Sequence, residues 1–354
     1  MLDIQIVERM GDMEANPAAI FFLSAGLFMG WSLGANDAAN IMGTAVSTRM
    51  IKFKSAALII SVFVALGAVI SGAGTTETLG QLGSIDRLEE AFMASLAAAL
   101  VVMVMTRNGL PVSTSQSIIG ALVGWNLFHG YSVDLQLLVR IAGTWVFAPV
   151  LGAMMAITLY LIIAPLWKKM PVHIVRRDRW LRILLVIAGA FGAYSLGANN
   201  MANVVGIFVN SLHIPDLSWN TFTLLSGQQM LFLLGALAVS VGVYTYSYKV
   251  MSTIGSGIIN LTPAHALIIV LSSALVLFLF ASQNLQEWLI ANNLPSFPLV
   301  PVSQSQAVVG SVVGIGLAKG GRNIKISLLG KIFIGWVITP IASIILVFFL
   351  LTFS

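Results

Sequence analysis

The amino-acid sequence predicts an all-α polytopic membrane protein of two inverted-topology repeats. Each repeat has about five membrane-crossing units, or 10–12 helices in all, with broken helices or hairpins near the membrane midplane. Of the 354 residues, 58% are hydrophobic and only 9% are charged, whereas a soluble domain carries about 25% charged residues. Apolar runs of about 20 residues, the length that crosses a bilayer, follow one another along the chain. A polar motif occurs twice, each time inside such a run.

The apolar runs divide the chain into four parts: an N-terminal tail at 1–17, a first repeat at 18–165, a basic linker at 166–181 and a second repeat at 182–354. The tail carries four acids and no basic start, so we do not expect a cleavable signal peptide. The expected spans of the first repeat are 18–48 (interrupted), 55–74, 91–107, 109–130 (interrupted) and 136–165. Those of the second are 182–212 (interrupted), 221–247, 263–281, 301–318 (interrupted) and 327–352.

The basic residues predict the orientation of the chain. The linker is rich in Lys and Arg, so the positive-inside rule places it in the cytoplasm. Ten crossings threaded outward from it put 15 of the 18 Lys and Arg residues inside and both termini outside a cytoplasmic cell membrane. Five crossings per half is an odd number, so the halves run in opposite directions, as in many secondary transporters. Because the positive charge lies beside spans, we expect a lipid bilayer and not nucleic acid as the partner.

Polar motifs recur in the same order in both halves. Residues 32–51 and 195–214 share ten identities in twenty positions, where about two are expected by chance. We call their cores, Gly-Ala-Asn-Asp-Ala-Ala-Asn at 34–40 and Gly-Ala-Asn-Asn-Met-Ala-Asn at 197–203, the first and second signatures. Pro-Val-Ser recurs at 111–113 and 301–303, and Trp-Val-x-x-Pro at 145–149 and 336–340. The offset grows from 163 to 190, and we assign part of the extra length to an outer loop at 282–300.

The Pro-Val-Ser segments are expected to start new helices inside the membrane. Proline suits the first turn of a helix, and Ser or Thr caps it. A helix N-terminus presents unpaired N–H groups and partial positive charge, which can hold an anion without a cationic side chain. Capping or packing alone is the alternative role for these segments. The candidate anion-binding residues are Asp37, Ser113, Thr114, Ser115, Gln116, Ser303, Gln304, Ser305 and Gln306.

The two signatures supply oxygen ligands. Asp37 is the one acid within the polar motifs, and Asn200 stands at the equivalent position of the second copy. Carboxylate and amide oxygens suit a small hard cation such as sodium, and an ionisable residue inside a membrane indicates function. We expect no other metal and no cofactor. The candidate cation-binding residues are Asn36, Asp37, Asn40, Asn199, Asn200 and Asn203.

These motifs resemble those of the inorganic phosphate transporter family, PiT, whose members carry a duplicated Gly-Ala-Asn-Asp-x-Ala-Asn signature. The resemblance covers nearly the whole chain, because both signatures, both Pro-Val-Ser segments and the final Trp-Val-x-x-Pro span occur in family order. It implies a homodimeric inverted-repeat carrier that moves phosphate with sodium, or with protons in some bacterial members. It also implies a set of residues that face the substrate or the cation: Asn36, Asp37, Asn40, Asn199, Asn200, Asn203, Ser113, Thr114, Ser115, Ser303, Gln304 and Ser305.

Departures from the family pattern leave alternatives open. The second signature reads Asn199-Asn200 where many members have Asn-Asp, and Gln116 replaces a histidine that many members carry. Fewer titratable groups favour sodium over proton coupling. A sulfate or related oxyanion permease is the alternative within the same class, and an anion channel the alternative outside it. An intramembrane enzyme is not expected, because the chain has no cysteine and no nucleophile–base set.

Overall fold

The computed structural model describes residues 17–353 except 84, 170–172, 213, 220–221, 260 and 322–323. The predicted tail therefore lies outside the described residues, apart from Pro17. Within the described part, seven helices are long and apolar enough to cross a membrane, or eight if α12 and α13 form one bent span. The chain is thus a multi-pass membrane protein. The shorter helices α7 and α14 follow the two Pro-Val-Ser segments, where the sequence predicts broken spans.

The first half contains one small helical insert besides the predicted spans. Its elements are α2 (Pro17–Leu33), η1 (Gly34–Ala38), α3 (Ala39–Ser47), α4 (Phe53–Ser71), α5 (Ala73–Leu82), α6 (Leu88–Arg107), α7 (Thr114–His129) and α8 (Leu135–Lys169). Helix α5 was not predicted. It follows α4 directly and packs against α9 of the second half. Glu77 on α5 is exposed, as expected of a solvated acid.

The second half adds a hairpin and a short helix to the same plan. Its elements are α9 (Ile174–Val205), η2 (Gly206–Phe208), β1 (Leu217–Trp219), β2 (Phe222–Leu225), α10 (Gly227–Tyr246), α11 (Tyr248–Ser252), η3 (Thr253–Gly257), α12 (Pro263–Leu279), α13 (Gln283–Ala291), α14 (Gln304–Ala318) and α15 (Ile326–Thr352). The span predicted from residue 221 begins at Gly227, because 222–225 pair with 217–219 as an antiparallel hairpin. Helices α8 and α9 extend into the predicted linker 166–181.

The signatures do not break their helices, which corrects the prediction of interrupted spans at 18–48 and 182–212. The first signature forms the π-helical turn η1 and continues into α3, and the second lies wholly inside α9. The small residues of the signatures explain why the helices continue, since neighbouring helices pack directly against them. A Cβ added at Gly34 would lie 2.0 Å from the Val239 carbonyl oxygen, and one at Gly197 would lie 2.1 Å from that of Val64. Tight crossing stabilises these helices where the sequence indicates a break.

Helices of the two halves pack crosswise. Helix α2 packs on α10 and α9 on α4, while α7 packs on α15 and α14 on α8. The duplicated Gly and Pro residues meet at the last two crossings: Gly120 lies against Pro340, and Gly310 against Pro149. Each half therefore completes the packing of the other.

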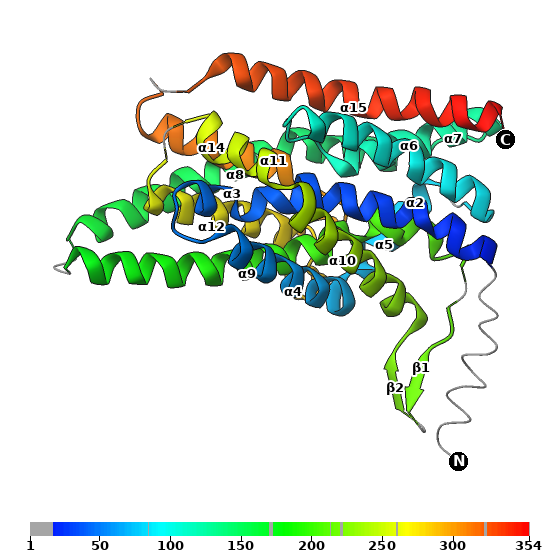
Figure 1. Cartoon of the computed structure of the whole chain (residues 1–354), viewed down its shortest axis with the longest axis horizontal. Helices are drawn as coiled ribbons and strands as arrows, with labels where there is room; N and C mark the ends of the chain where they lie inside the picture. Colours follow the sequence, from blue (N-terminus) through cyan, green and yellow to red (C-terminus); the bar gives the residue numbers. More distant parts are fainter. Residues whose placement is uncertain are drawn as a thin grey trace.

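The starts of α2 and α9 lie at opposite ends of the bundle. Figure 1 shows α2 (blue) beginning at the end where α15 (red) finishes, while α8 ends and α9 begins at the other end. The two signature helices consequently run in opposite directions. An inverted repeat requires this relation of the first helix in each half; the inversion of the complete halves stays a prediction.

Candidate functional site

The two half-helices begin with serine caps, as the sequence predicts. The Ser113 Oγ accepts a hydrogen bond from the Gln116 backbone N–H at 3.1 Å, and the Ser303 Oγ accepts one from Gln306 at 3.2 Å. Both hydroxyls are buried. Each cap satisfies one of the N–H groups that a helix N-terminus leaves unpaired. Ser113 and Ser303 thus fix the starts of α7 and α14 inside the protein.

The first asparagine of each signature clamps the chain before the half-helix of its own repeat. The Asn36 Oδ1 accepts from the Val112 N–H at 3.1 Å, and its Nδ2 donates to the Leu110 carbonyl at 3.0 Å. Asn199 repeats this pattern with the Val302 N–H at 2.6 Å and the Val300 carbonyl at 3.0 Å. Irregular backbone inside a membrane needs such partners. Asn36 and Asn199 therefore hold the breaks in place.

Asp37 lies between the N-termini of both half-helices. Its Oδ2 accepts from the Thr114 backbone N–H at 3.2 Å and also from the Thr114 hydroxyl. The Ser305 backbone N–H at the start of α14 also lies near this carboxylate. Asp37 is fully buried, and its Oδ1 has no hydrogen-bond partner among the described residues. The carboxylate thus occupies the position where a helix N-terminus stabilises negative charge.

Ser115 joins the second signature to α7. Its hydroxyl oxygen accepts from the Asn200 Nδ2 at 3.2 Å and from the Asn203 Nδ2 at 2.8 Å. Asn200 also donates to the Val302 carbonyl at 3.2 Å, just before α14. The structure therefore brings the four predicted polar segments together, although each signature lies in a different half.

Several buried side-chain oxygens of the predicted site residues have no hydrogen-bond partner in the part of the chain that the structure describes. Buried polar atoms normally find partners, so a cluster of exceptions indicates a place for a cation or a hydrogen-bond donor. No Lys or Arg is among the buried residues of the described chain. The unpartnered oxygens on the predicted site residues are Asp37 Oδ1, Asn40 Oδ1, Asn200 Oδ1, Asn203 Oδ1, Gln116 Oε1, Gln304 Oε1 and Gln306 Oε1.

Three threonines near these residues escaped sequence reasoning. The Thr106 Oγ1 accepts from the Asn36 Nδ2 at 2.7 Å, and Thr75 on α5 donates to the Asn199 carbonyl at 3.0 Å. Thr44 lies one turn after Asn40, and its buried hydroxyl is unpartnered. Only Thr44 could have been predicted as a site residue from the sequence, because helical spacing places it on the same face as Asp37 and Asn40.

The fold and the site together define a class of protein. A multi-pass bundle with two helix N-termini and oxygen-rich signatures meeting in its interior has the architecture of a membrane carrier. The model of the Phosphate transporter family matches residues 33–347 of the chain. The protein therefore belongs to the Phosphate transporter family, which is a family of transporters and not of enzymes.

Several relatives agree with this membership. The chain is 29% identical to a "Putative phosphate permease" of Pyrococcus horikoshii over 93% of its own length and 96% of that protein. It is 27% identical to a "Probable low-affinity inorganic phosphate transporter" of Rhizobium meliloti, covering 94% of this chain and 95% of that one. A solved structure described as "The sodium-dependent phosphate transporter" has the same fold, with a TM-score of 0.74, 24% identity and coverage of 95% and 99% of the two chains.

Proposed function

We propose that the protein is a secondary active transporter that moves inorganic phosphate together with sodium by alternating access. One observation carries the proposal: the N-termini of α7 and α14 converge on the buried Asp37 carboxylate. A carboxylate and a phosphate compete for the same backbone N–H donors. Sodium bound at the free Asp37 Oδ1 would draw the carboxylate away from Thr114, and the released donors would then receive phosphate.

The neighbouring oxygens support this role of sodium. Asn40 and Thr44 follow Asp37 on one helix face, and Asn200 and Asn203 present unpartnered oxygens from the second half. These are hard ligands of the kind that small hard cations prefer. Sodium also lowers the cost of bringing an anion into an environment of low dielectric constant. Phosphate, which carries at least one proton near pH 7, can donate a hydrogen bond to an unpartnered oxygen such as the Gln116 Oε1, whereas sulfate has no proton to donate.

Alternating access is supported by the crosswise packing. Helix α5 contacts α9, the helix of the second signature, whereas α11 and η3 contact α3 of the first. We propose that α5 on one side of a cytoplasmic membrane, and α11 with η3 on the other side, move apart from their neighbours alternately and so open the site to each side in turn. The linker at 166–181 would lie in the cytoplasm and both termini outside.

The test is uptake of labelled phosphate into proteoliposomes, with and without an inward sodium gradient and with excess unlabelled sulfate. Sodium-driven uptake that sulfate does not suppress is the expected result. Uptake that sulfate blocks would assign the protein to the oxyanion alternative. Acceleration by a proton gradient alone would replace sodium with protons, and uncoupled flux would indicate a channel.

Asp37→Asn is the decisive variant. Its amide can still accept from Thr114, so we expect a folded protein that has lost sodium-driven uptake by at least about tenfold, because charge-assisted hydrogen bonds and cation ligation each contribute more than 1.4 kcal/mol. Glu89→Gln, which removes an exposed acid at the start of α6, is the matched control. Unchanged sodium-driven uptake in Asp37→Asn would exclude the assigned role.

A further inference from the structure

Residues 168–182, which we call the basic segment, carry the whole net charge of the protein. They contain six Lys or Arg residues and one Asp, a net charge of +5, which equals the net charge of the complete chain. The 12 basic and 12 acidic residues elsewhere cancel. A bias of Lys and Arg toward the cytoplasm orients a membrane protein, but it does not require so many of them in one turn. Their concentration indicates an anionic partner at this place.

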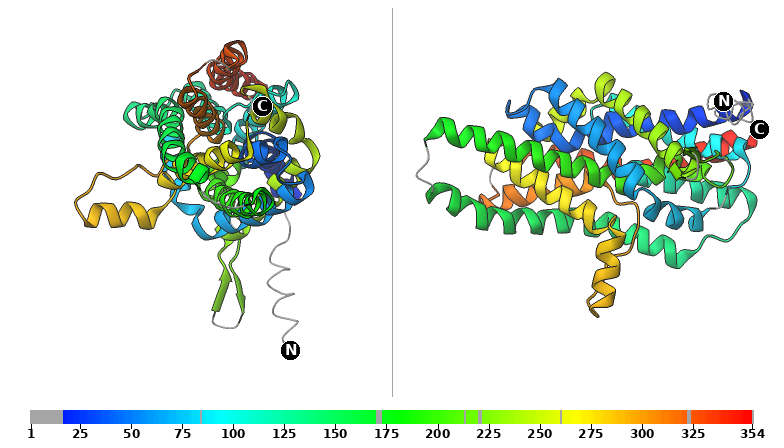
Figure 2. Two further views of the ribbon diagram at one scale, coloured as in Figure 1. Left: turned by 90° about the vertical axis from the view of Figure 1, so that its left-hand side faces the viewer. Right: turned by 90° about the horizontal axis from the view of Figure 1, so that it is seen from below.

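The described part of the basic segment lies at the tip of a helix pair. Helix α8 ends at Lys169 and α9 begins at Ile174. Figure 2 shows both helices (green) extending beyond their neighbours at this end of the bundle. The side chains of Arg176, Arg179 and Arg182 are exposed. Their charges are therefore accessible to the surroundings of the protein.

The first turns of α9 present one face to the lipid. Arg176, Trp180 and Ile183 follow one another at intervals of four and three residues, which places them on one side of the helix. The side chains of Trp180 and Ile183 are 55% and 43% exposed. Leu181 and Leu185, on the opposite side, are buried. The face that carries Arg176 is therefore directed away from the bundle.

Trp180 marks the level of the membrane interface on this face. Tryptophan favours the layer between the hydrocarbon and the headgroups, and Ile183 and Ile187, which follow on the same face, are exposed and apolar. Arg176 lies one turn before Trp180, about 5.4 Å farther from the hydrocarbon, and Arg179 immediately precedes Trp180. Both guanidinium groups therefore lie at the depth of lipid phosphate groups.

The charges at this level lack an anion. Arg182 lies 3.8 Å from Asp178, whereas Arg176 and Arg179 form no ion pair within the described chain. Basic residues near the start of a helix also oppose its dipole, and the first turn of α9 contains no acid. Guanidinium groups bind phosphate oxygens through two parallel hydrogen bonds. A phosphate group would therefore compensate both the arginines and the helix dipole.

We propose that Arg176 and Arg179 bind the phosphate group of an acidic phospholipid in the cytoplasmic leaflet. The acyl chains lie along the face at Ile183 and Ile187. An acidic lipid fits better than a zwitterionic one, because the only acid of the basic segment, Asp178, is already paired and cannot receive a headgroup amine. The lipid is a bound partner and not a transported substrate, so the inference goes beyond the proposed transport function.

Quenching of Trp180 fluorescence by brominated lipids tests the site. The full chain is reconstituted in vesicles that contain brominated phosphatidylglycerol or brominated phosphatidylcholine. The difference between the wild-type protein and Trp180→Phe isolates the signal of Trp180. We expect the apparent affinity for phosphatidylglycerol to be about 25-fold higher, since each basic residue near an anionic surface contributes about fivefold. Equal quenching by the two lipids would overturn the proposal.

Arginine variants provide a second measurement. Arg176→Gln and Arg179→Gln should each reduce the preference about fivefold, and the double variant should abolish it. Arg49→Gln, which removes another exposed arginine in the turn after α3, is the control and should keep the full preference. A double variant that still prefers phosphatidylglycerol would contradict the assignment.

Free phosphate is distinguished from lipid in the same vesicles. Excess inorganic phosphate, added at constant ionic strength, should leave the quenching of Trp180 by phosphatidylglycerol unchanged. Loss of the preference on this addition would show that the arginines bind the free anion, and would overturn the lipid site. None of these measurements requires transport, so failure of phosphate uptake leaves their outcomes unaffected.

Discussion

At the scale of single residues, equivalent positions of the two signatures form equivalent contacts. The first asparagine of each holds the chain before a half-helix, while Asp37 and Asn200 face the start of the half-helices themselves. Equivalent positions thus differ in charge at one point only. In the proposed mechanism, that difference determines which half offers a carboxylate to sodium.

Asn200→Asp tests this asymmetry. It places a second carboxylate beside the unpartnered oxygens and removes the amide that donates to Ser115 and Val302. We expect the sodium concentration for half-maximal uptake to fall by about tenfold, since one added charge near a cation contributes a few kcal/mol before its desolvation cost is subtracted. The apparent affinity for phosphate should weaken. Asn108→Asp, at an exposed helix end, should change neither value; an unaltered sodium titration in Asn200→Asp would show that the asymmetry has no role.

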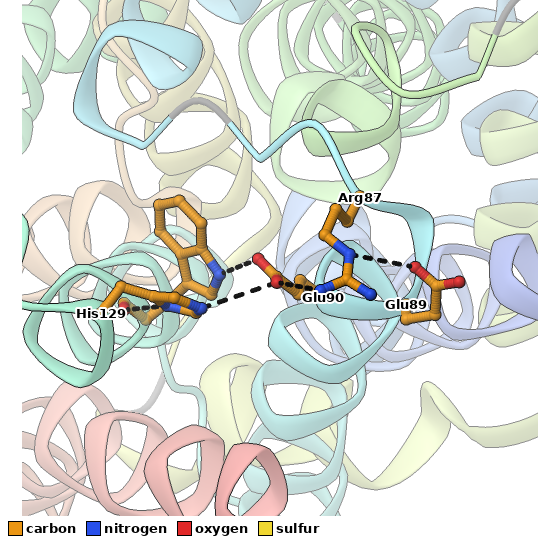
Figure 3. Close-up of polar contacts among 5 residues, drawn as sticks. Arg87, Glu89, Glu90 and His129 are labelled. Atoms are coloured by element: carbon orange, nitrogen blue, oxygen red, sulfur yellow. Dashed lines mark hydrogen bonds and ion pairs between the residues drawn. The ribbon is translucent and has the colours of Figure 1, made fainter. Parts of the chain in front are cut away.

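A partly buried carboxylate also stabilises the C-terminal end of α7. Figure 3 shows Glu90 between Arg87 and His129: its Oε2 accepts from the Trp125 Nε1 at 2.7 Å, while its Oε1 lies 3.6 Å from the His129 Nε2 and 3.5 Å from Arg87. The side chain of Glu90 is 14% exposed, against 50% for Glu89. Glu90 thereby links the start of α6 to the end of α7.

We expect Glu90→Ala to lower the free energy of unfolding by about 1–3 kcal/mol, because it leaves the Trp125 N–H without an acceptor. Glu90→Gln keeps an acceptor and should cost less. Glu89→Ala removes only an exposed contact and should stay within about 0.5 kcal/mol. Thermal unfolding followed by tryptophan fluorescence measures all three, and equal losses at positions 89 and 90 would contradict the assignment.

At the scale of elements, crosswise helix packing gives the bundle its rigidity. The crossings of α7 with α15 and of α14 with α8 place a glycine of one helix against the backbone of the other, at the proline that recurs in each half. Small residues at such crossings let membrane helices approach closely. The half-helices that begin at the site are therefore anchored along their length by the opposite repeat.

Gly310→Ala should disturb this anchor. The added Cβ would lie 2.1 Å from the Pro149 carbonyl oxygen, so α14 must move away from α8. Overpacking of this kind costs about 1–3 kcal/mol, which should appear as a clear fall in melting temperature and in uptake. Gly330→Ala on α15 meets no atom within 4 Å and is the control. Equal melting temperatures for the two variants would show that the crossing is loose.

At the scale of the whole molecule, orientation in the membrane follows from charge. Helix α8 ends and α9 begins at one end of the bundle. Helix α2 begins and α15 finishes at the opposite end (Figure 1). The predicted ten crossings place 15 of the 18 Lys and Arg residues on the linker's side. The positive-inside rule then predicts a cytoplasmic linker.

Single cysteines test this orientation in a chain that otherwise has none. Val175→Cys at the start of α9 should react with an impermeant maleimide only in inside-out vesicles. Phe353→Cys after α15 should react only in right-side-out vesicles. Both side chains are exposed, so access depends on the side of the membrane. Labelling of both from one side would contradict the odd number of crossings per half.

The sequence by itself predicted the seven long apolar helices, the two helix starts after Pro111 and Pro301, and the polar segments that the structure brings together. Apolar length, proline and buried polar side chains act locally, so a linear reading detects them. It placed interruptions at the signatures, where the helices continue, because neighbours from the other half compensate for the small residues there.

Only the tertiary structure decided which partner each polar group has. Asp37 and Thr114 lie 77 positions apart, and Asn199 and Val302 lie 103 apart. Hydrogen bonds over such separations depend on how the halves pack, which no local pattern encodes. The same holds for residues 282–299, where the sequence predicts an outer loop. Their course away from the bundle depends on the hydrogen bonds that hold the Phe280 and Val300 carbonyls at Asn199.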